Sequence, residues 1–218
     1  MGNYPELLHL PDKESKIDYL NEMVNSYLLK DILVYENIKN SQKIFNLLQL
    51  IAFQIGCEVS LQELGQQLSI SKNTVEKYLD LLSKVYILHK VEGFSRNLRK
   101  EITKNSRWYF LDNVIRNAVI ANFNPVESRN DTGQLWENYM ISERIKYQEY
   151  KKLSSNNYFW RTYEQQEIDW IEERGGTLHG YEFKWKKTKV KIPPQWKNAY
   201  PDAKFKLINL QNFQTWLQ

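Results

Sequence analysis

The sequence predicts a mixed chain of the α+β or α/β class, with a helical N-terminal part and a C-terminal part that combines helices and strands. Three observations predict it. As far as Leu82, apolar residues recur every three or four positions, which is the period of one helix face. Between Tyr158 and Asn209, short apolar runs alternate with polar residues and turns, as in strands. A polar stretch from Glu127 to Thr132 separates the two parts and predicts a domain boundary.

Composition limits the class of protein. The chain has 218 residues, 42% hydrophobic and 26% charged, which is a globular balance. No run of 18 apolar residues and no secretory signal occur, so we expect a cytoplasmic protein without a membrane partner. The single cysteine excludes an internal disulfide framework and a Cys-rich zinc site, and the three histidines lie far apart without the spacing of metal ligands. A P-loop motif is also absent, so no ATPase activity is expected from this chain alone.

The first 40 residues are predicted to form a helical linker. After Pro11, apolar residues from Ile17 to Leu28 follow the helical period, and Asp12 or Ser15 is placed to cap the helix. A second helix begins at Ser41 and is apolar nearly all round, which indicates burial on most sides. Gly56 is placed to end it.

Residues 41–128 have the outline of a winged helix. Ser60 and Glu63 have the spacing of a capping box, and Ser71 is placed to cap the next helix. Apolar runs at 86–91 and 107–111 then predict two strands, which completes the helix, turn, helix and two strands of that fold. A further helix is expected from Asp112 to Asn124.

The outer face of the third helix in this pattern is a candidate DNA contact. It would present four residues that can reach phosphates or base edges, namely Lys72, Asn73, Thr74 and Lys77. Glu76 lies on the same helix and opposes phosphate attraction. Winged helices also serve as protein-interaction and spacer modules, so both interpretations stay open.

Residues 129–218 predict the order helix, three strands, helix, strand. The expected elements are a helix at 133–150, strands at 158–161, 167–171, 178–185 and 204–209, a short helix after Pro193 and a closing helix at 211–217. Gly175 and Gly176 form the turn between the second and third strands.

Strand alternation brings acidic residues together in this part. Ile168 and Trp170 are expected on one face of their strand, which leaves Asp169 on the other. On the next strand, Glu182 and Lys184 share a face. If those faces meet, two carboxylates and an ammonium converge. Two carboxylates suit Mg²⁺, and a lysine beside them can orient water or stabilise developing phosphate charge. Glu137, on the preceding helix, would add a third carboxylate.

These half-motifs, Glu167-Ile-Asp169 and Glu182-Phe-Lys184, resemble those of the PD-(D/E)XK nuclease superfamily, whose core is an αβββαβ unit. The resemblance implies a nuclease-like domain with Asp169 and Glu182 as metal ligands and Mg²⁺ as cofactor. Lys184 and Glu137 would complete its catalytic set. The alternative is that Glu-x-Lys on an exposed strand face forms only a cross-strand ion pair.

The whole chain resembles the C-terminal part of prokaryotic AAA-type ATPases that carry a domain of unknown function after their P-loop module. The similarity rests on Gly2-Asn-Tyr-Pro-Glu6, the stretch from Ser26 to Asp31, Leu135-Trp-Glu-Asn138 and Phe159-Trp-Arg161. It implies that residues 1–40 are the remnant of an ATPase lid. It also implies that the ATPase module, or a partner protein that carries it, acts together with this chain.

Two functions follow as expectations. In the first, the chain is the DNA-binding effector region of such an ATPase and cleaves phosphodiester bonds with Mg²⁺. Arg161, Lys186 and Lys187 would then contact phosphates, although a solvated lysine run and a pairing of Arg161 with Glu164 or Glu167 are the alternatives. In the second, a degenerate nuclease fold serves as a non-catalytic docking module for DNA or protein.

Overall fold

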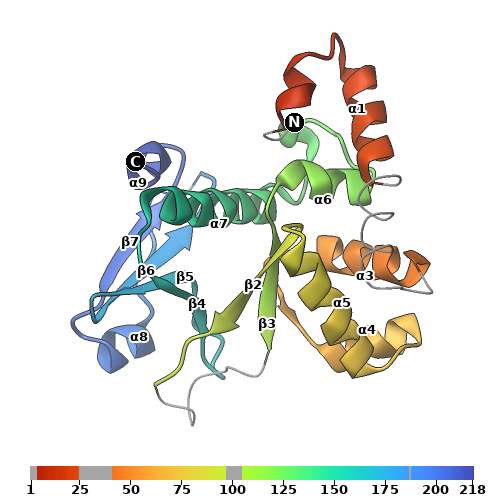
Figure 1. Ribbon diagram of the computed structural model, residues 1–218. Helices are drawn as coiled ribbons and strands as arrows, with labels where there is room; N and C mark the ends of the chain where they lie inside the picture. The colour runs from red at the N-terminus through yellow and green to blue at the C-terminus, as the bar shows by residue number, and fades with distance from the viewer. Residues whose placement is uncertain (1–3, 25–40, 97–104, 187) are drawn as a thin grey trace. The chain divides into compact units, whose positions relative to one another are not determined.

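A computed structural model describes residues 4–24, 41–96, 105–186 and 188–218 and confirms the mixed helix-and-strand class (Figure 1). Its contacts divide the chain into two units. The first comprises Met1–His89 and Trp108–Arg129, and the second comprises Lys90–Arg107 and Asn130–Gln218. The second unit therefore begins close to the boundary predicted at residue 129, but it also includes a segment from the middle of the chain.

The first unit is mainly helical. Its strands follow the order β1-β3-β2, and α1 packs against α6. Its elements in chain order are η1 (Pro5–Leu8), α1 (Lys13–Glu22), α3 (Ser41–Phe53), β1 (Glu58–Val59), α4 (Leu61–Leu68), α5 (Lys72–Lys84), β2 (Leu88–Gly93), β3 (Ser106–Phe110), α6 (Asn113–Val119) and η3 (Val126–Ser128), with β2 and β3 each continuing into the second unit.

The predicted helix starts are confirmed by their caps. The Glu63 N–H donates to Ser60 Oγ over 3.3 Å, and the Thr74 N–H donates to Ser71 Oγ over 3.1 Å. Asp12, the first of the two candidates, caps α1 by accepting from the Ser15 N–H. Gly65 allows the turn between α4 and α5 to approach closely, because a Cβ there would lie 2.8 Å from the Ile70 carbonyl oxygen.

The end of α5 differs from the prediction. The sequence predicts a strand from Tyr86, whereas β2 begins at Leu88. Tyr86 instead has a φ of +59° and ends the helix, with its own N–H bonded to the Ser83 carbonyl and the Ile87 N–H bonded to the Leu82 carbonyl. This pair of hydrogen bonds is a Schellman motif, and because of it the strand begins two residues later than predicted. Similarly, α6 ends at Val119 rather than at Asn124.

The second unit follows the predicted order of helix, three strands, helix and strand. Its strands follow the order β2-β4-β5-β6-β7, with β4, β5 and β6 antiparallel and with parallel pairs at β2–β4 and β6–β7. Its elements are α7 (Thr132–Lys151), β4 (Asn156–Arg161), β5 (Glu167–Arg174), β6 (Thr177–Phe183), α8 (Pro194–Ala199), β7 (Lys204–Ile208) and α9 (Phe213–Trp216).

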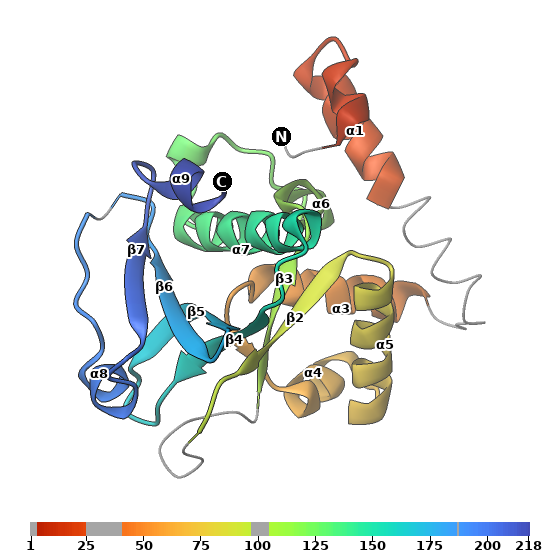
Figure 2. The same ribbon diagram turned by 60° about the vertical axis from the view of Figure 1, so that its left-hand side comes forward.

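Helices cover both faces of this sheet (Figure 2). On one face, Trp196 and Tyr200 at α8 pack with Phe94, Ile168 and Leu178 in an aromatic-rich core. On the other, α9 places the Trp216 ring against the rings of Tyr181 and Phe183, and α7 lies over β6. Five of the six tryptophans in this unit are buried, and Trp185 is half-buried. Among the helices that the structure describes, none has the length and apolar content to cross a lipid bilayer.

Candidate functional site

The candidate metal ligand Asp169 lies at a β-bulge in β5. Tyr158 pairs with Ile171 and Trp160 with Ile168, so Phe159 faces two residues, Asp169 and Trp170. The expectation that Ile168 and Trp170 share a face is therefore wrong. Ile168 packs in the aromatic core beside Trp196, whereas the Trp170 indole N–H donates to Glu172, which pairs with Arg144 of α7. Such a bulge breaks strict alternation and re-aims side chains, a feature frequent next to active sites.

Asp169 lies where β5 and β6 separate. The last residue pair of this ladder is Trp170 with Tyr181, and beyond it the Phe183 N–H donates to Asp169 Oδ2 over 2.8 Å. The carboxylate thus replaces a main-chain acceptor. The residue is 3% exposed, and burial raises the pKa of Asp169, although the Lys184 ammonium and the Phe183 N–H act to lower it.

Lys184 connects both candidate ligands. Its Nζ lies 2.6 Å from Glu182 Oε1 and 3.5 Å from Asp169 Oδ2. Burial and the neighbouring Asp169 carboxylate raise the pKa of Glu182 to about 7. Burial acts to lower the pKa of Lys184, but the carboxylates of Asp169 and Glu182 outweigh it and raise that pKa above its ordinary value. The predicted convergence of one ammonium and two carboxylates is therefore present in the structure.

Glu137 stands at the edge of this cluster, on the first turns of α7. It is half-buried, and its charge contributes to the raised pKa of Lys184. Its Oε1 lies 3.9 Å from Arg107 NH1. Arg107 also donates from NH2 to Glu167 Oε2 over 2.9 Å, and its side chain is 5% exposed. Sequence reasoning missed Arg107. The available signal was a cationic residue at the start of an otherwise apolar strand.

Asp169 and Glu182 are the residues of this cluster that could hold a hard cation, and a carboxylate oxygen of each lies within 3.5 Å of Lys184 Nζ. Within the described ranges, no three or more Asp, Glu, His or Cys side chains gather closely enough to hold a metal ion together. An ion bound by two carboxylates takes its remaining ligands from water, as Mg²⁺ prefers.

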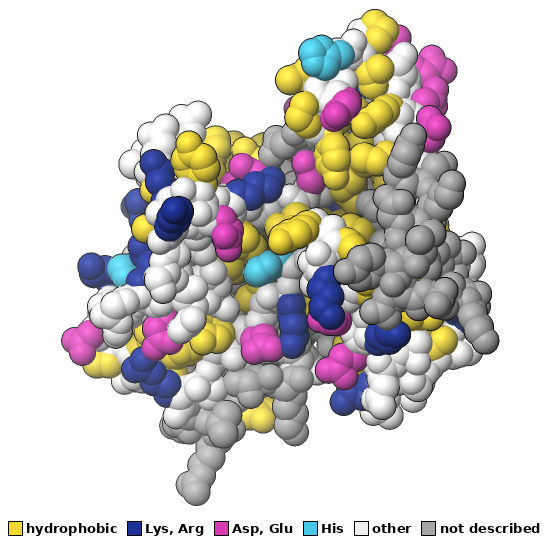
Figure 3. Space-filling view, viewed as in Figure 1, with side chains coloured by type: hydrophobic (Ala, Val, Ile, Leu, Met, Phe, Trp, Pro, Cys, Tyr) yellow, Lys and Arg dark blue, Asp and Glu magenta, His cyan; other side chains and the backbone are white. Residues whose placement is uncertain are grey.

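Of the predicted phosphate contacts of the second unit, Arg161 is half-buried and Lys186 is exposed. Arg161 lies opposite Glu167 in the register of β4 and β5, and its NH2 donates to Gln165 Oε1 over 3.0 Å. Lys186 is exposed on the segment after β6, and Lys187 lies outside the described residues. From Arg174 to Gln218 the chain has nine Lys or Arg and two acidic residues. Positive side chains recur over β7, α8 and the segment between β6 and α8 (Figure 3), and the exposed lysines are Lys186, Lys189, Lys191, Lys197, Lys204 and Lys206.

The candidate DNA contacts of the first unit are in α5. Lys72, Asn73 and Lys77 are exposed, as the helical period predicts. Thr74 is half-buried, and its Oγ1 lies 2.8 Å from Ser71 Oγ within the helix cap. Thr74 is therefore already engaged in helix capping, and three of the four predicted side chains face solvent.

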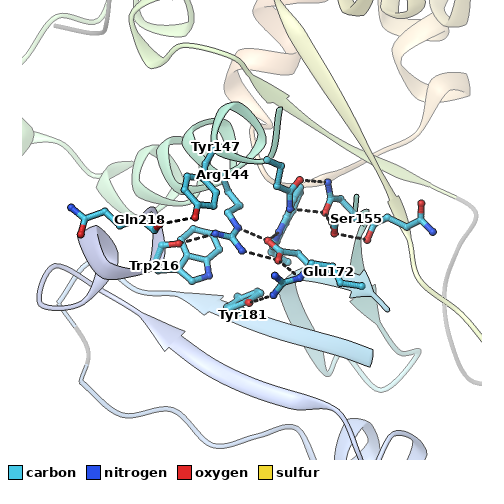
Figure 4. Close-up of polar contacts among 12 residues, drawn as sticks. Arg144, Tyr147, Ser155, Glu172, Tyr181, Trp216 and Gln218 are labelled. Atoms are coloured by element: carbon cyan, nitrogen blue, oxygen red, sulfur yellow. Dashed lines mark hydrogen bonds and ion pairs between the residues drawn. The ribbon is translucent and has the colours of Figure 1, made fainter. Parts of the chain in front are cut away.

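A buried polar network fixes the far end of α7 (Figure 4). Arg144 bonds both oxygens of Glu172 and donates from NH1 to the Trp216 carbonyl over 2.8 Å. Arg174 Nε lies 3.1 Å from Glu172 Oε2. The network thus connects the C-terminal half of α7 to β5 and α9.

Two family models match the chain. One, described as a domain of unknown function (DUF8612), matches residues 1–126, and a second, described as a domain of unknown function (DUF4143), matches residues 132–212. The border between the two matches lies near the start of the second unit's main segment at Asn130.

Curated relatives are distant and longer. An uncharacterized protein of Haemophilus influenzae is 23% identical over 125 residues, which are 55% of this chain and 31% of the relative. One of Mycobacterium tuberculosis is 23% identical over 138 residues, 62% of this chain and 30% of the relative. One of Methanocaldococcus jannaschii is 23% identical over 147 residues, 65% of this chain and 31% of the relative. The matched segment thus spans under a third of each relative. No solved structure matches the chain.

Proposed function

The chain belongs to the family described as a domain of unknown function (DUF8612). We propose that its second unit is a Mg²⁺-dependent phosphodiesterase acting on DNA. We further propose that it works as the C-terminal effector region of an AAA-type ATPase. The single observation that carries the proposal is the position of Lys184, whose ammonium lies 2.6 Å from Glu182 and 3.5 Å from Asp169.

The proposed chemistry assigns a role to each residue of the cluster. Asp169 and Glu182 would hold the ion, which polarises a phosphoryl oxygen and lowers the pKa of bound water. Lys184 would orient the attacking water and stabilise charge that develops on the phosphate. Glu137 would accept hydrogen bonds from the remaining waters. Burial of Asp169 strengthens each of these interactions, because the surroundings are of low dielectric constant.

Topology supports this assignment. The order α7-β4-β5-β6-α8-β7, with β6 and β7 parallel, is that expected of a PD-(D/E)XK core, and the acidic residues lie on its second and third strands. In the first unit, the order α3-β1-α4-α5-β2-β3 and the strand order β1-β3-β2 are typical of a winged helix. The exposed Lys72, Asn73 and Lys77 would there contact DNA.

The ATPase connection rests on the sequence resemblance and on length. The curated relatives are about three times as long as the segments they share with this chain. The second family model, which matches residues 132–212, describes a domain typically associated with AAA-type ATPases. The ATPase module would therefore be supplied by further sequence or by a partner.

Cleavage of a labelled duplex and of a labelled single strand tests the proposal. With Mg²⁺ or Mn²⁺, we expect the wild-type chain to cut DNA and Asp169→Asn to lose at least about 100-fold in rate, since metal-assisted hydrolysis depends on its ligands. The Asn variant keeps an oxygen for the Phe183 N–H, so we expect the fold to be preserved. Robust cutting by the Asn variant would refute the assignment.

A non-catalytic docking module is the second candidate. The observation that favours it is the Lys184 ammonium, which already neutralises charge on both carboxylates. Calorimetric titration with Mn²⁺ separates the two functions. A docking module gives no binding heat in either the wild type or Glu182→Gln, and it binds DNA in a salt-sensitive manner without any metal.

A further inference from the structure

Arg107 is a fixed cation at the edge of the acidic cluster, contributed by a strand that precedes the αβββαβ segment. Its NH2 lies 2.9 Å from Glu167 Oε2 and its NH1 lies 3.9 Å from Glu137 Oε1, so the guanidinium bridges β5 and α7. It also lies over the buried Phe159 ring, 4.4 Å from the ring centroid. The side chain is 5% exposed, so burial, two carboxylates and an aromatic face together define its position.

The charges of the cluster indicate the role of Arg107. Two carboxylates, Asp169 and Glu182, contact the Lys184 ammonium, and two others, Glu137 and Glu167, contact Arg107. Nucleases that use two metal ions stabilise both the attacking and the leaving oxygen with divalent cations held by acidic residues. In this chain, a guanidinium lies between the second pair of carboxylates. Arginine is charged at every accessible pH, and its planar fork matches carboxylate geometry.

We propose that Arg107 is a positioning residue that takes the place of a second divalent cation, so that the site accepts one metal ion rather than two. This inference rests on the proposed function, in which Asp169 and Glu182 hold the first ion. Arg107 would keep Glu137 and Glu167 apart from that ion and would hold Glu137 toward Lys184. The chain would accordingly use single-metal chemistry, with one permanent positive charge beside the ion.

The number of Mn²⁺ ions bound tests the inference without any measurement of activity. Calorimetry and the electron paramagnetic resonance signal of free Mn²⁺ both count bound equivalents. We expect one equivalent for the wild type and two for Arg107→Gln, because the variant releases Glu137 and Glu167. Arg107→Lys keeps the charge and should return to one equivalent. The double variant Arg107→Gln/Glu167→Gln removes a cation and a carboxylate together and should also bind one.

A further variant keeps the inference testable if Arg107→Gln does not fold. Glu167 is half-exposed at the start of β5, so Glu167→Gln is a mild change. It leaves the Arg107 charge uncompensated beside the ion and should weaken Mn²⁺ binding by roughly fivefold or more, on the Coulomb energy of one added charge. The double variant should recover the wild-type affinity.

The outcomes separate the two proposals. If the wild type binds no Mn²⁺, the proposed function fails, and this inference falls with it. If the wild type binds one equivalent and folded Arg107→Gln also binds one with unchanged affinity, only the role of Arg107 is overturned. Equal affinities for Glu167→Gln, the double variant and the wild type would overturn it as well, since they would show that the Arg107 charge does not act on the bound ion.

Discussion

Arg144 and Glu172 form a two-bond ion pair inside the second unit, with 2.6 Å between Nε and Oε1 and 2.9 Å between NH2 and Oε2. Their side chains are 6% and 0% exposed. Every oxygen of Glu172 has partners, since the Trp170 indole also donates to Oε1 and Arg174 contacts Oε2. The pair joins α7 to β5 and, through the Trp216 carbonyl, to the C-terminal helix.

Removal of one partner of this pair should destabilise the second unit strongly. Arg144→Met leaves the Glu172 carboxylate buried without its main partner, and we expect a loss of about 3–5 kcal/mol in the free energy of unfolding. Urea denaturation measures it. Lys146→Ala is the matched control, because the Lys146–Glu143 pair lies on the surface of the same helix and should contribute under about 1 kcal/mol. Equal losses in the two variants would contradict the assigned role.

Lys184→Met should separate metal binding from cleavage. Without the ammonium, Asp169 and Glu182 attract a divalent ion more strongly, so Mn²⁺ affinity at pH 8 should rise about tenfold. Cleavage should fall by about 100-fold or more, because the group proposed to orient water is gone. Calorimetry and DNA cleavage on the same preparation measure both. Weaker Mn²⁺ binding by a folded variant would show that Lys184 instead organises the carboxylates.

Stability should decrease as pH rises through the titration of Glu182. The pKa of Glu182 is raised to about 7 by burial and by Asp169, so the folded chain holds this proton more tightly than the unfolded chain. The stabilising contribution is complete below about pH 4.5 and is lost as pH increases toward and beyond 7. Asp169, whose pKa is also raised by burial, adds in the same direction.

Glu182→Gln should remove the Glu182 part of this dependence. We expect the wild type to lose about 3 kcal/mol relative to the Gln variant between pH 4.5 and pH 8, measured by denaturant unfolding without metal. Saturating Mg²⁺ should reduce the difference, because the ion stabilises the charged carboxylate. Parallel pH profiles for the two chains would contradict the assigned environment of Glu182.

The exposed lysines of α5 should determine the salt dependence of DNA binding. Each of Lys72→Gln and Lys77→Gln should lower the slope of log affinity against log salt by about 1, because one fewer counterion is released. Fluorescence anisotropy at several salt concentrations measures the slope. Lys84→Gln is the control on the same helix, where Lys84 pairs with Asp80 over 2.7 Å. A slope unchanged in both test variants would remove α5 from the DNA interface.

Tyr86→Gly should stabilise the first unit. Tyr86 has a φ of +59° at the end of α5, and its side chain is 81% exposed, so the ring adds strain and little packing. Glycine adopts this conformation freely, and we expect a gain of about 0.5–1 kcal/mol in thermal or urea unfolding. Tyr86→Ala removes the ring but keeps the Cβ, so it should stabilise the unit much less than Tyr86→Gly does. A loss of stability on Tyr86→Gly would mean that the ring packs in solution.

Local sequence signals predicted most of the elements. Ser60, Ser71 and Asp12 determine helix starts through hydrogen bonds within three residues, so their caps could be predicted without knowledge of the fold. The convergence of Asp169, Glu182 and Lys184 was also predicted, because the hairpin turn at Gly175 and Gly176 fixes which strands are neighbours.

Features that depend on tertiary contacts were not predicted. The bulge at Asp169 depends on the pairing of β5 with β4, and strict alternation therefore placed Ile168 and Trp170 on one face incorrectly. Arg107 lies 60 positions from Glu167 in sequence, and nothing near it indicates its partner. The Ser26–Asp31 element of the family resemblance lies outside the described residues.

Asp169 is a member of the acidic cluster, and its carboxylate also accepts a hydrogen bond from the Phe183 amide, which joins β5 to β6. Truncation to alanine at this position would strip a buried amide of its acceptor, and any inactive product would confound misfolding with lost chemistry. Asparagine keeps an oxygen at this place, so Asp169→Asn is the substitution that separates the structural role of Asp169 from the chemical role proposed for it.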